Sequence, residues 1–181
     1  SSSSDSGSST TSDNTTTTSS GLFVAVGDSG TILTSTDGTT WDNRSYETPS
    51  RLRAVTHANS AFMTVGYTDE IILSSSDGIS WNNIRSGTGN LRGVAYGNNK
   101  FVVVGRSGHI STSSDGTSWD NRTSGTSTGL YGVNYVNNQF VVVGQVGTIL
   151  TSSDGISWDN RTISGQTIYL YHVTHGNNKF V

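Results

Sequence analysis

Carboxylate side chains that could act on a glycoside are scarce in this sequence. The candidates for such chemistry are Glu47, Asp69 and Glu70, and the two glutamates among them are the only ones in the chain. Glycoside hydrolysis requires two carboxyl groups that face each other across the bond to be cleaved. No spacing in the sequence singles out such a pair, so we predict no catalytic residues.

Metal and nucleophile chemistry is equally poorly supported. His57, His172 and His175 offer imidazole nitrogens, but residues an odd number apart on a strand point to opposite faces, which separates His172 from His175. The absence of cysteine excludes disulfides, zinc–thiolate sites and cysteine nucleophiles. Nucleophile-elbow, phosphate-loop and EF-hand patterns are also absent. We therefore predict neither a metal nor a cofactor.

Composition narrows the classes of partner. The 181 residues carry a net charge of −3, and 13% of them are charged, about half of the usual share of roughly 25%. Ten Lys and Arg residues and a pI of 5.7 do not make the basic surface that nucleic acid requires. No apolar run approaches the roughly 18 residues of a membrane span. We predict no nucleic-acid partner, and membrane attachment only through a lipid anchor outside this sequence.

The first 21 residues differ from the rest. Ten serines and six threonines lie within the first 20 positions, and a segment with nothing apolar to bury does not offset the entropy of ordering. We interpret residues 1–21 as a tether. The run resembles the Ser/Thr-rich stretch that follows the lipidated cysteine of bacterial lipoproteins; an expression or interdomain linker is the alternative.

Residues 22–181 repeat with a period of about 39. Aromatic residues mark the steps: phenylalanines recur 39, 39, 39 and 40 residues apart and tryptophans 40, 38 and 39 apart. Such a period is the signature of a repeat architecture. The repeat units are 22–51, 52–90, 91–129 and 130–169, and residues 170–181 are a closing strand or the start of a further unit.

Each unit is expected to hold four short strands. In the third unit these cover residues 91–97, 101–105, 109–113 and 117–123, and no helical periodicity interrupts them. The pair Asp115-Gly116 predicts a two-residue type I′ hairpin between the third and fourth strands. The sequence Gly97-Asn98-Asn99 predicts a turn between the first and second. Four antiparallel strands in about 40 residues indicate the blade of a β-propeller.

A sequence motif of the form Ser-[Ser/Thr]-Asp-Gly-x-[Ser/Thr]-Trp begins at the end of the third strand of every unit, at residues 35–41, 75–81, 113–119 and 152–158. It resembles the Asp-box repeat of sialidase-like propellers, although glycine follows the aspartate one residue earlier than in that pattern. The stretch Val26–Thr34 resembles the blades of photosystem II assembly factors. Both resemblances imply an all-β propeller, usually with six to eight blades.

The motif residues are predicted to be structural. The aspartates cap backbone N–H groups of their own turns, and the tryptophans lie on the fourth strand and pack between blades. These residues are Asp37, Trp41, Asp77, Trp81, Asp115, Trp119, Asp154 and Trp158. The sialidase resemblance would further require an arginine triad, a Tyr–Glu pair and an acidic proton donor, and the channel offers two arginines.

The first strand of each blade should line the central channel, where its side chains form two columns. One column is Arg53, Arg92, Tyr131 and Tyr171, and the other is His57, Tyr96, Tyr135 and His175. Within each strand the two column positions are an even number of residues apart, which predicts that both columns point to the same side of the sheet. The columns are either a ring around a ligand or packing between blades. The recurring Arg44, Arg85, Arg122 and Arg161 follow the tryptophans and are predicted to be solvated charges at the outer edge.

Two sets of connections vary between units while the others are constant. The variable sets follow the second and fourth strands, so in a meander both lie on one rim, where binding usually resides. We therefore predict an extracellular, periplasmic or cell-surface scaffold that binds protein or glycan. The alternatives are a self-assembling structural module, which is a homo-oligomer, and a glycoside-processing enzyme. Three ways of closing the ring stay open: the four blades close on themselves, the chain continues and adds further blades, or two copies combine into one larger ring.

Overall fold

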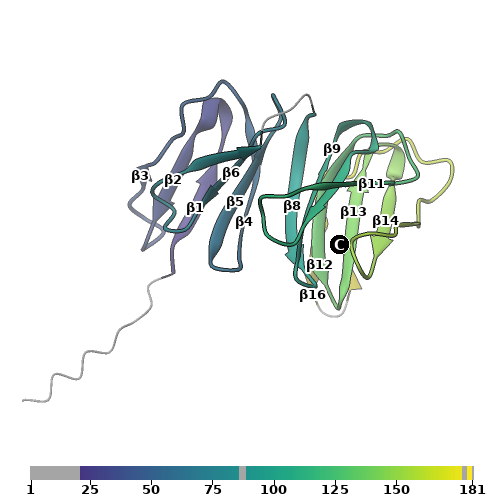
Figure 1. Ribbon diagram of the computed structural model, residues 1–181. Coiled ribbons are helices and arrows are strands. Elements are labelled where there is room, and N and C mark those ends of the chain that lie inside the picture. The colour runs from purple at the N-terminus through teal and green to yellow at the C-terminus, as the bar shows by residue number, and fades with distance from the viewer. Residues whose placement is uncertain (1–20, 86–88, 177–178, 181) are drawn as a thin grey trace, which may run out of the picture.

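The computed structural model describes residues 21–85, 89–176 and 179–180, so almost all of the predicted tether lies outside the described residues. The described chain is all-β, and its sheets stand side by side in a row like the blades of a propeller, as Figure 1 shows. None of its helices is long and apolar enough to cross a membrane.

The sheets follow the predicted repeats. Blade 1 consists of β1 (Phe23–Val26), β2 (Ile32–Ser35) and β3 (Asp42–Asn43). Blade 2 consists of β4 (Leu52–Ala58), β5 (Ala61–Gly66), β6 (Ile72–Ser75) and β7 (Asn82–Arg85). Blade 3 consists of β8 (Leu91–Gly97), β9 (Lys100–Gly105), β10 (Ile110–Ser113) and β11 (Asp120–Arg122). Blade 4 consists of β12 (Leu130–Val136), β13 (Gln139–Gly144), β14 (Ile149–Ser152) and β15 (Asp159–Asn160).

Shorter elements complete the chain. In blade 1, β1 corresponds to the second strand of the other blades. A single 3₁₀ turn follows this strand in blades 1, 3 and 4: η1 (Asp28–Gly30), η2 (Arg106–Gly108) and η3 (Gln145–Gly147). A short hairpin of β16 (His175–Gly176) and β17 (Lys179–Phe180) follows blade 4. All pairing within the sheets is antiparallel and joins strands that are consecutive in the chain, which is the meander expected of propeller blades.

The turn that was expected to be a type I′ hairpin has a different structure. Gly116 has a φ of +78°, but Asp115 is not among the residues with positive φ, and a type I′ turn needs positive φ at both. Instead, Oδ1 of Asp115 accepts hydrogen bonds from the N–H groups of Thr117 and Ser118, at 2.8 and 2.7 Å. The loop therefore extends over residues 114–119, and β11 is shorter than predicted.

Backbone with two consecutive positive φ values occurs at the other hairpin of the blade. Asn98 and Asn99, between β8 and β9, have φ values of +43° and +55°. Asparagine tolerates this conformation better than other non-glycine residues. The tight turn is thus at the predicted Gly-Asn-Asn position.

The core lies between the blades, and the second strands of blades 2 and 3, which have a blade on either side, are covered on both faces. Phe101, Val102, Val103 and Val104 of β9 are all buried. Val102 and Val104 pack toward blade 4, whereas Phe101 and Val103 pack toward blade 2. This explains the uninterrupted apolar run, since a strand with two covered faces does not alternate.

The tryptophans pack at the interfaces, as predicted, but each stands one residue before the fourth strand rather than on it. Trp81 belongs to the cluster between blades 1 and 2, and Trp119 and Trp158 pack against the next two clusters. Trp41 has no preceding blade among the described residues, and 42% of its surface is exposed. The described blades do not close into a ring (Figure 1).

Candidate functional site

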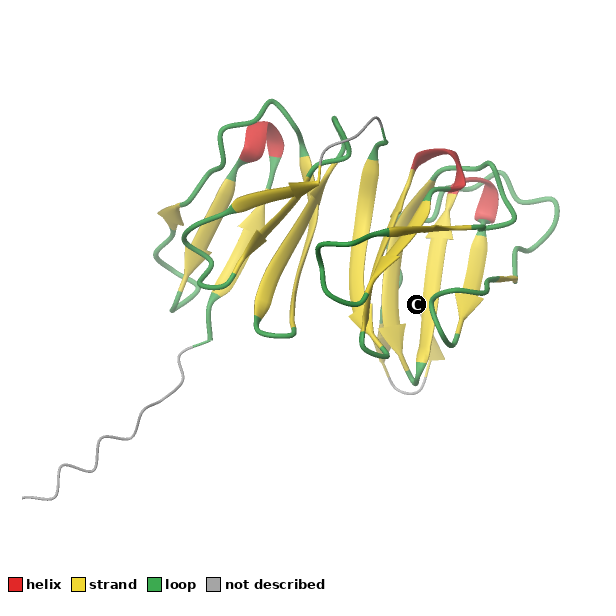
Figure 2. Ribbon diagram, viewed as in Figure 1, coloured by secondary structure: helices red, strands yellow, loops and turns green. Residues whose placement is uncertain are grey.

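Apart from residues 86–88, which lie outside the described residues, the variable connections are on one rim of the molecule, the upper rim in Figure 2, where the 3₁₀ turns lie. Backbone hydrogen bonds tie each turn after a second strand to the following connection. Gly30 donates to the carbonyl of Ser50 at 2.8 Å, and Gly108 donates to that of Thr128 at 2.7 Å. The loops of this rim are therefore held to one another by backbone hydrogen bonds.

The first predicted column forms a ladder of planar groups across the blades. The guanidinium of Arg92 lies 4.8 Å from the ring centre of Tyr67 and 4.5 Å from that of Tyr131. Tyr131 in turn stacks on Tyr171, with centroids 5.2 Å apart and an interplanar angle of 9°. At the opposite end of the ladder, the guanidinium of Arg53 lies 5.5 Å from the ring centre of Tyr67. These distances are those of cation–π and stacking contacts.

The ladder extends to Tyr169, which stacks on both Tyr131 and Tyr171, at 6.3 and 6.4 Å. Tyr169 and Tyr171 are 54% and 67% exposed. Two flat ring faces are thus available to solvent at the end of the ladder near blade 4. We call the set Arg53, Tyr67, Arg92, Tyr131, Tyr169 and Tyr171 the aromatic ladder.

Two features of the first strands bring the ladder residues together. The pairing of each first strand shifts register between residues 52 and 54, 91 and 93, and 130 and 132, so the ladder residue is the extra one of a β-bulge. Glycines then allow the strands to approach closely. A Cβ atom at Gly132 would lie 2.8 Å from the carbonyl oxygen of Tyr171, closer than side-chain carbons come in proteins.

A cavity of about 270 Å³ runs along this ladder. Its lining includes Arg53, Arg92, Tyr131 and Tyr171, together with the first-strand residues that follow them. Among the described residues, neither arginine forms an ion pair with a carboxylate. The cavity therefore combines cationic planar groups with ring faces.

The second predicted column has a different role. His57, Tyr96 and Tyr135 each pack on the phenylalanine opposite them on the neighbouring strand, with ring centroids 4.4 to 4.7 Å apart. Tyr135 also covers Gly97, because a Cβ atom there would fall within the tyrosine ring. His175 lies 3.0 Å from the side-chain amide of Asn137. These contacts are packing, and the bulges explain why parity failed to separate the columns.

A buried polar cluster in blades 2 and 3 was not predicted. Glu70 is 6% exposed, and its carboxylate lies 2.7 Å from the guanidinium of Arg85 and 3.4 Å from Nε2 of His109. The same Nε2 is 2.9 Å from the hydroxyl of Ser111, which donates to Asn121 at 2.7 Å. Burial lowers the pKa of His109, Arg85 lowers it further, and Glu70 opposes the change.

The outer arginines are ion-paired rather than simply solvated. Arg44, Arg122 and Arg161 each contact an aspartate two residues earlier, at 2.9 to 3.1 Å. Arg85 departs from this pattern because asparagines precede it, and its partner is Glu70. The prediction of free edge charges is therefore wrong for Arg85 and incomplete for the others.

The motif aspartates cap their turns as predicted. Oδ1 of Asp37 accepts hydrogen bonds from the N–H groups of Thr39 and Thr40, both at 2.8 Å. Bonds from the backbone and hydroxyl of Thr40, and then from Thr39, hold the pKa of Asp37 well below its usual range. The equivalent backbone N–H bonds lower the pKa of the other three, which are Asp77, Asp115 and Asp154.

The remaining candidates for catalysis stay apart. Glu47 and Asp69 are exposed, whereas Glu70 is buried in its ion pair. In the part of the chain that the structure describes, no three His, Asp or Glu side chains gather as metal ligands would. Tyr67 and Tyr169, which the sequence analysis missed, were recognisable as aromatic residues in otherwise variable connections.

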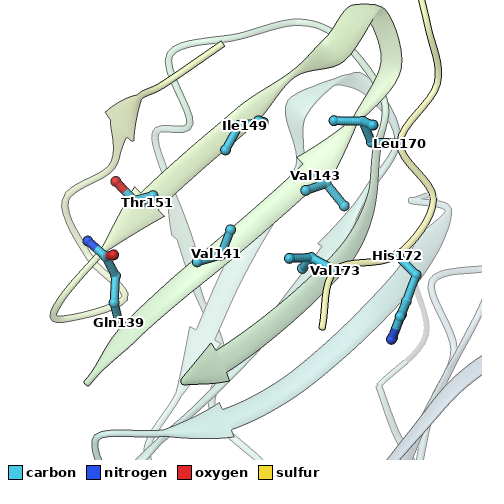
Figure 3. Close-up of a pocket in the computed structure, with 8 residues that line it drawn as sticks. All are labelled: Gln139, Val141, Val143, Ile149, Thr151, Leu170, His172 and Val173. Atoms are coloured by element: carbon cyan, nitrogen blue, oxygen red, sulfur yellow. The ribbon is translucent and has the colours of Figure 1, made fainter. Parts of the chain in front are cut away.

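A second cavity, of about 360 Å³, lies on the outer face of blade 4. Figure 3 shows Val141, Val143 and Ile149 on one side of it and Leu170 and Val173 on the other. Gln139, Thr151 and His172 complete its lining, which is more apolar than that of the cavity along the aromatic ladder.

Comparison with known proteins supports the fold. Neither a protein-family model nor a curated protein matches the sequence. Among solved structures, YCF48 from Cyanidioschyzon merolae matches with a TM-score of 0.62 and 20% identity, over 86% of this chain and 56% of that one. A structure of YCF48 bound to D1 peptide gives 0.62 and 22%, over 77% and 50%.

Virginiamycin B lyase from Staphylococcus aureus matches with a TM-score of 0.74 and 12% identity, over 85% of this chain and 59% of that one. The chain thus spans between half and three fifths of the length of these structures. The likenesses confirm the predicted propeller fold.

Proposed function

We propose that this chain is a binding scaffold that takes up a segment of a partner protein along the aromatic ladder. The observation that carries the proposal is Arg92, whose guanidinium lies 4.8 and 4.5 Å from the centres of two tyrosine rings, beside a cavity. The two rings hold the guanidinium in place, and its charge has no carboxylate partner among the described residues. A carboxylate of the partner would supply one.

The exposed ring faces favour a partner with planar or apolar side chains next to its carboxylates. Tyr169 and Tyr171 offer such faces beside the cavity, and tyrosines are common anchors at protein interfaces. YCF48, a propeller with the same fold, has been solved with a D1 peptide bound, which supports a peptide as the class of partner. A glycan is the alternative, because sugars also stack on tyrosine rings.

We propose a non-enzymatic role at the cell surface or outside the cell. The low charge and the Ser/Thr-rich first 20 residues favour that location, and an export signal in the full gene would test it. A glycoside-processing enzyme would show turnover on a glycoside panel that Glu47→Gln or Glu70→Gln abolishes. We expect no turnover, because Glu70 is buried against Arg85.

The binding proposal is tested by probing the protein against an array of peptides with graded carboxylate and aromatic content, and against a glycan array. We expect retention on acidic, aromatic peptides that falls at least tenfold with Arg92→Met. Arg106→Met is the matched control, because Arg106 is exposed on the same rim but outside the ladder. Retention on glycans alone, or equal loss in both variants, would contradict the proposal.

A further inference from the structure

The two ends of the described chain are complementary parts of one blade. In blades 2 to 4 the second strand is hydrogen-bonded to a first strand, but β1 lies at the edge of its three-stranded sheet. At the other end, the N–H of Leu170 donates to the carbonyl of Gly144 at 3.0 Å. The equivalent bond, from Leu52 to Gly27 at 2.9 Å, begins the first strand of blade 2. Residues 170–176 therefore occupy the place of a first strand.

Each interface in the row pairs two different faces. Between blades 3 and 4, the receiving face of blade 3 includes Val102, Val104 and Ile110. One repeat later, 39 residues along the chain, the same positions are Val141, Val143 and Ile149. These three residues line the apolar cavity on the outer face of blade 4 (Figure 3).

The inserted face of the same interface is made by blade 4, through Phe140, Leu150 and Trp158. Three repeats earlier, 117 residues back, these positions are Phe23, Leu33 and Trp41 in blade 1. Phe23 is 55% and Trp41 42% exposed. At the positions whose side chains fill the receiving face at the interior interfaces, blade 1 therefore leaves Phe23 and Trp41 exposed and Leu33 half-buried.

We propose that the first blade of a second copy of this chain docks on the outer face of blade 4, which Leu170 and Val173 cover only in part, with its β1 beside residues 170–176. The docked β1, of four residues, would take the place of the two-residue β17 on β16. A second copy is the occupant because blade 1 of the same copy lies at the opposite end of the row (Figure 1). The contact continues the series of interfaces within the chain.

A contact between two different faces closes into a ring or propagates as a filament. Two copies joined by two such contacts make a ring of eight blades, which is within the size range of propellers. The inference can fail separately from the binding proposal. Tyr171 of the aromatic ladder lies within residues 170–176, but neither Trp41 nor Ile149, the two residues changed in the test, belongs to the ladder.

The test is light scattering coupled to size exclusion, on the full chain at tens of micromolar. We expect twice the monomer mass of 19.1 kDa, or a larger multiple. Trp41→Glu removes the inserted face and Ile149→Glu the receiving face, so each variant alone should remain monomeric. An equimolar mixture should associate again, because each variant retains the face that the other lacks.

The mixture forms a single contact and should therefore need at least tenfold higher concentration than the unmodified protein. Ile156→Thr is the matched control: Ile156 is 40% exposed in a loop of blade 4, and threonine stands at the same position in blades 1 and 3. Phe23→Glu and Thr151→Glu replace either variant that fails to fold by circular dichroism. A monomeric unmodified protein, a mixture that stays monomeric, or association that persists in Trp41→Glu would overturn the proposal.

Discussion

At the scale of single residues, Glu70 departs furthest from its counterparts in the other blades. The equivalent turn positions are Gly30, Gly108 and Gly147, with φ values of +65° to +71°, whereas Glu70 has a φ of +47°. A residue other than glycine in this region costs roughly 1–2 kcal/mol. The ion pair with the half-buried Arg85 opposes this strain, because it gives both Glu70 and Arg85 a counter-charge at a place with little access to solvent.

The His109 imidazole beside this pair should make stability depend on pH. Its pKa is lowered by burial, so the unfolded chain binds a proton near pH 6.5 that the folded chain resists. The free energy of unfolding therefore decreases as the pH falls below about 6.5. The decrease is about 1.4 kcal/mol for each pH unit until the pH reaches the lower pKa of the folded chain. Thermal unfolding should show a larger drop between pH 7.5 and 5.5 in the unmodified protein than in His109→Thr.

Threonine is the suitable replacement because Thr31 and Thr148 hold this position in blades 1 and 4. His57→Asn is the control for the loss of a histidine as such, because His57 is exposed and lies outside the cluster of Glu70 and Arg85. Equal drops in His109→Thr and the unmodified protein would refute the assignment.

At the scale of elements, neighbouring side chains determine which turn conformation the Asp-Gly dipeptide adopts. The hydroxyl of Ser113 accepts the N–H of Gly116 at 2.8 Å and donates to Asp115 at 2.9 Å. Asp115 is thereby held so that it caps the next two N–H groups. These bonds stabilise a six-residue loop over the two-residue hairpin that Asp-Gly otherwise favours.

The 3₁₀ turn of blade 4 contains an unfavourable residue. Val146 has a φ of +56°, a conformation in which a β-branched side chain is a genuine outlier. Val146→Asn should raise the free energy of unfolding by about 1 kcal/mol in urea. Ile156→Asn, which also replaces an exposed apolar residue but at a position without positive φ, should give no gain. A gain of the same size in both would attribute the effect to polarity instead.

At the scale of the whole molecule, the blades are stable only as a row, because the clusters of buried residues lie between neighbouring sheets rather than within one. Such arrays derive their stability from nearest-neighbour interfaces. The two ends of the row therefore differ in energy from the middle, even where the sequence is the same.

The tryptophans allow this difference to be measured. Trp81 is 8% exposed and Trp41 42% exposed, although they occupy the same position of the motif. Trp81→Ala should lower the free energy of unfolding by about 3–5 kcal/mol, and Trp41→Ala by less than about 1 kcal/mol. Urea unfolding at submicromolar protein, where copies are apart, checks this. Similar losses would mean that blade 1 is covered in the isolated chain.

The sequence by itself determined the features that depend on neighbouring residues. The 39-residue period, the strands of each blade, the capping aspartates and the recurring tryptophan after each Asp-Gly turn all follow from local alternation and turn chemistry. The Gly-Asn-Asn turn was foreseen for the same reason. Each of these is decided within one repeat, and four copies made the pattern unambiguous.

Only the tertiary structure decided what happens between repeats. The bulges at Arg53, Arg92 and Tyr131 separated the two columns that strand parity had placed together. The pairing of Glu70 with Arg85 and the exposure of Trp41 likewise depend on how whole sheets stand against each other. Such contacts join strands far apart in the chain, and their register is set by packing of the assembled blades rather than by any local pattern.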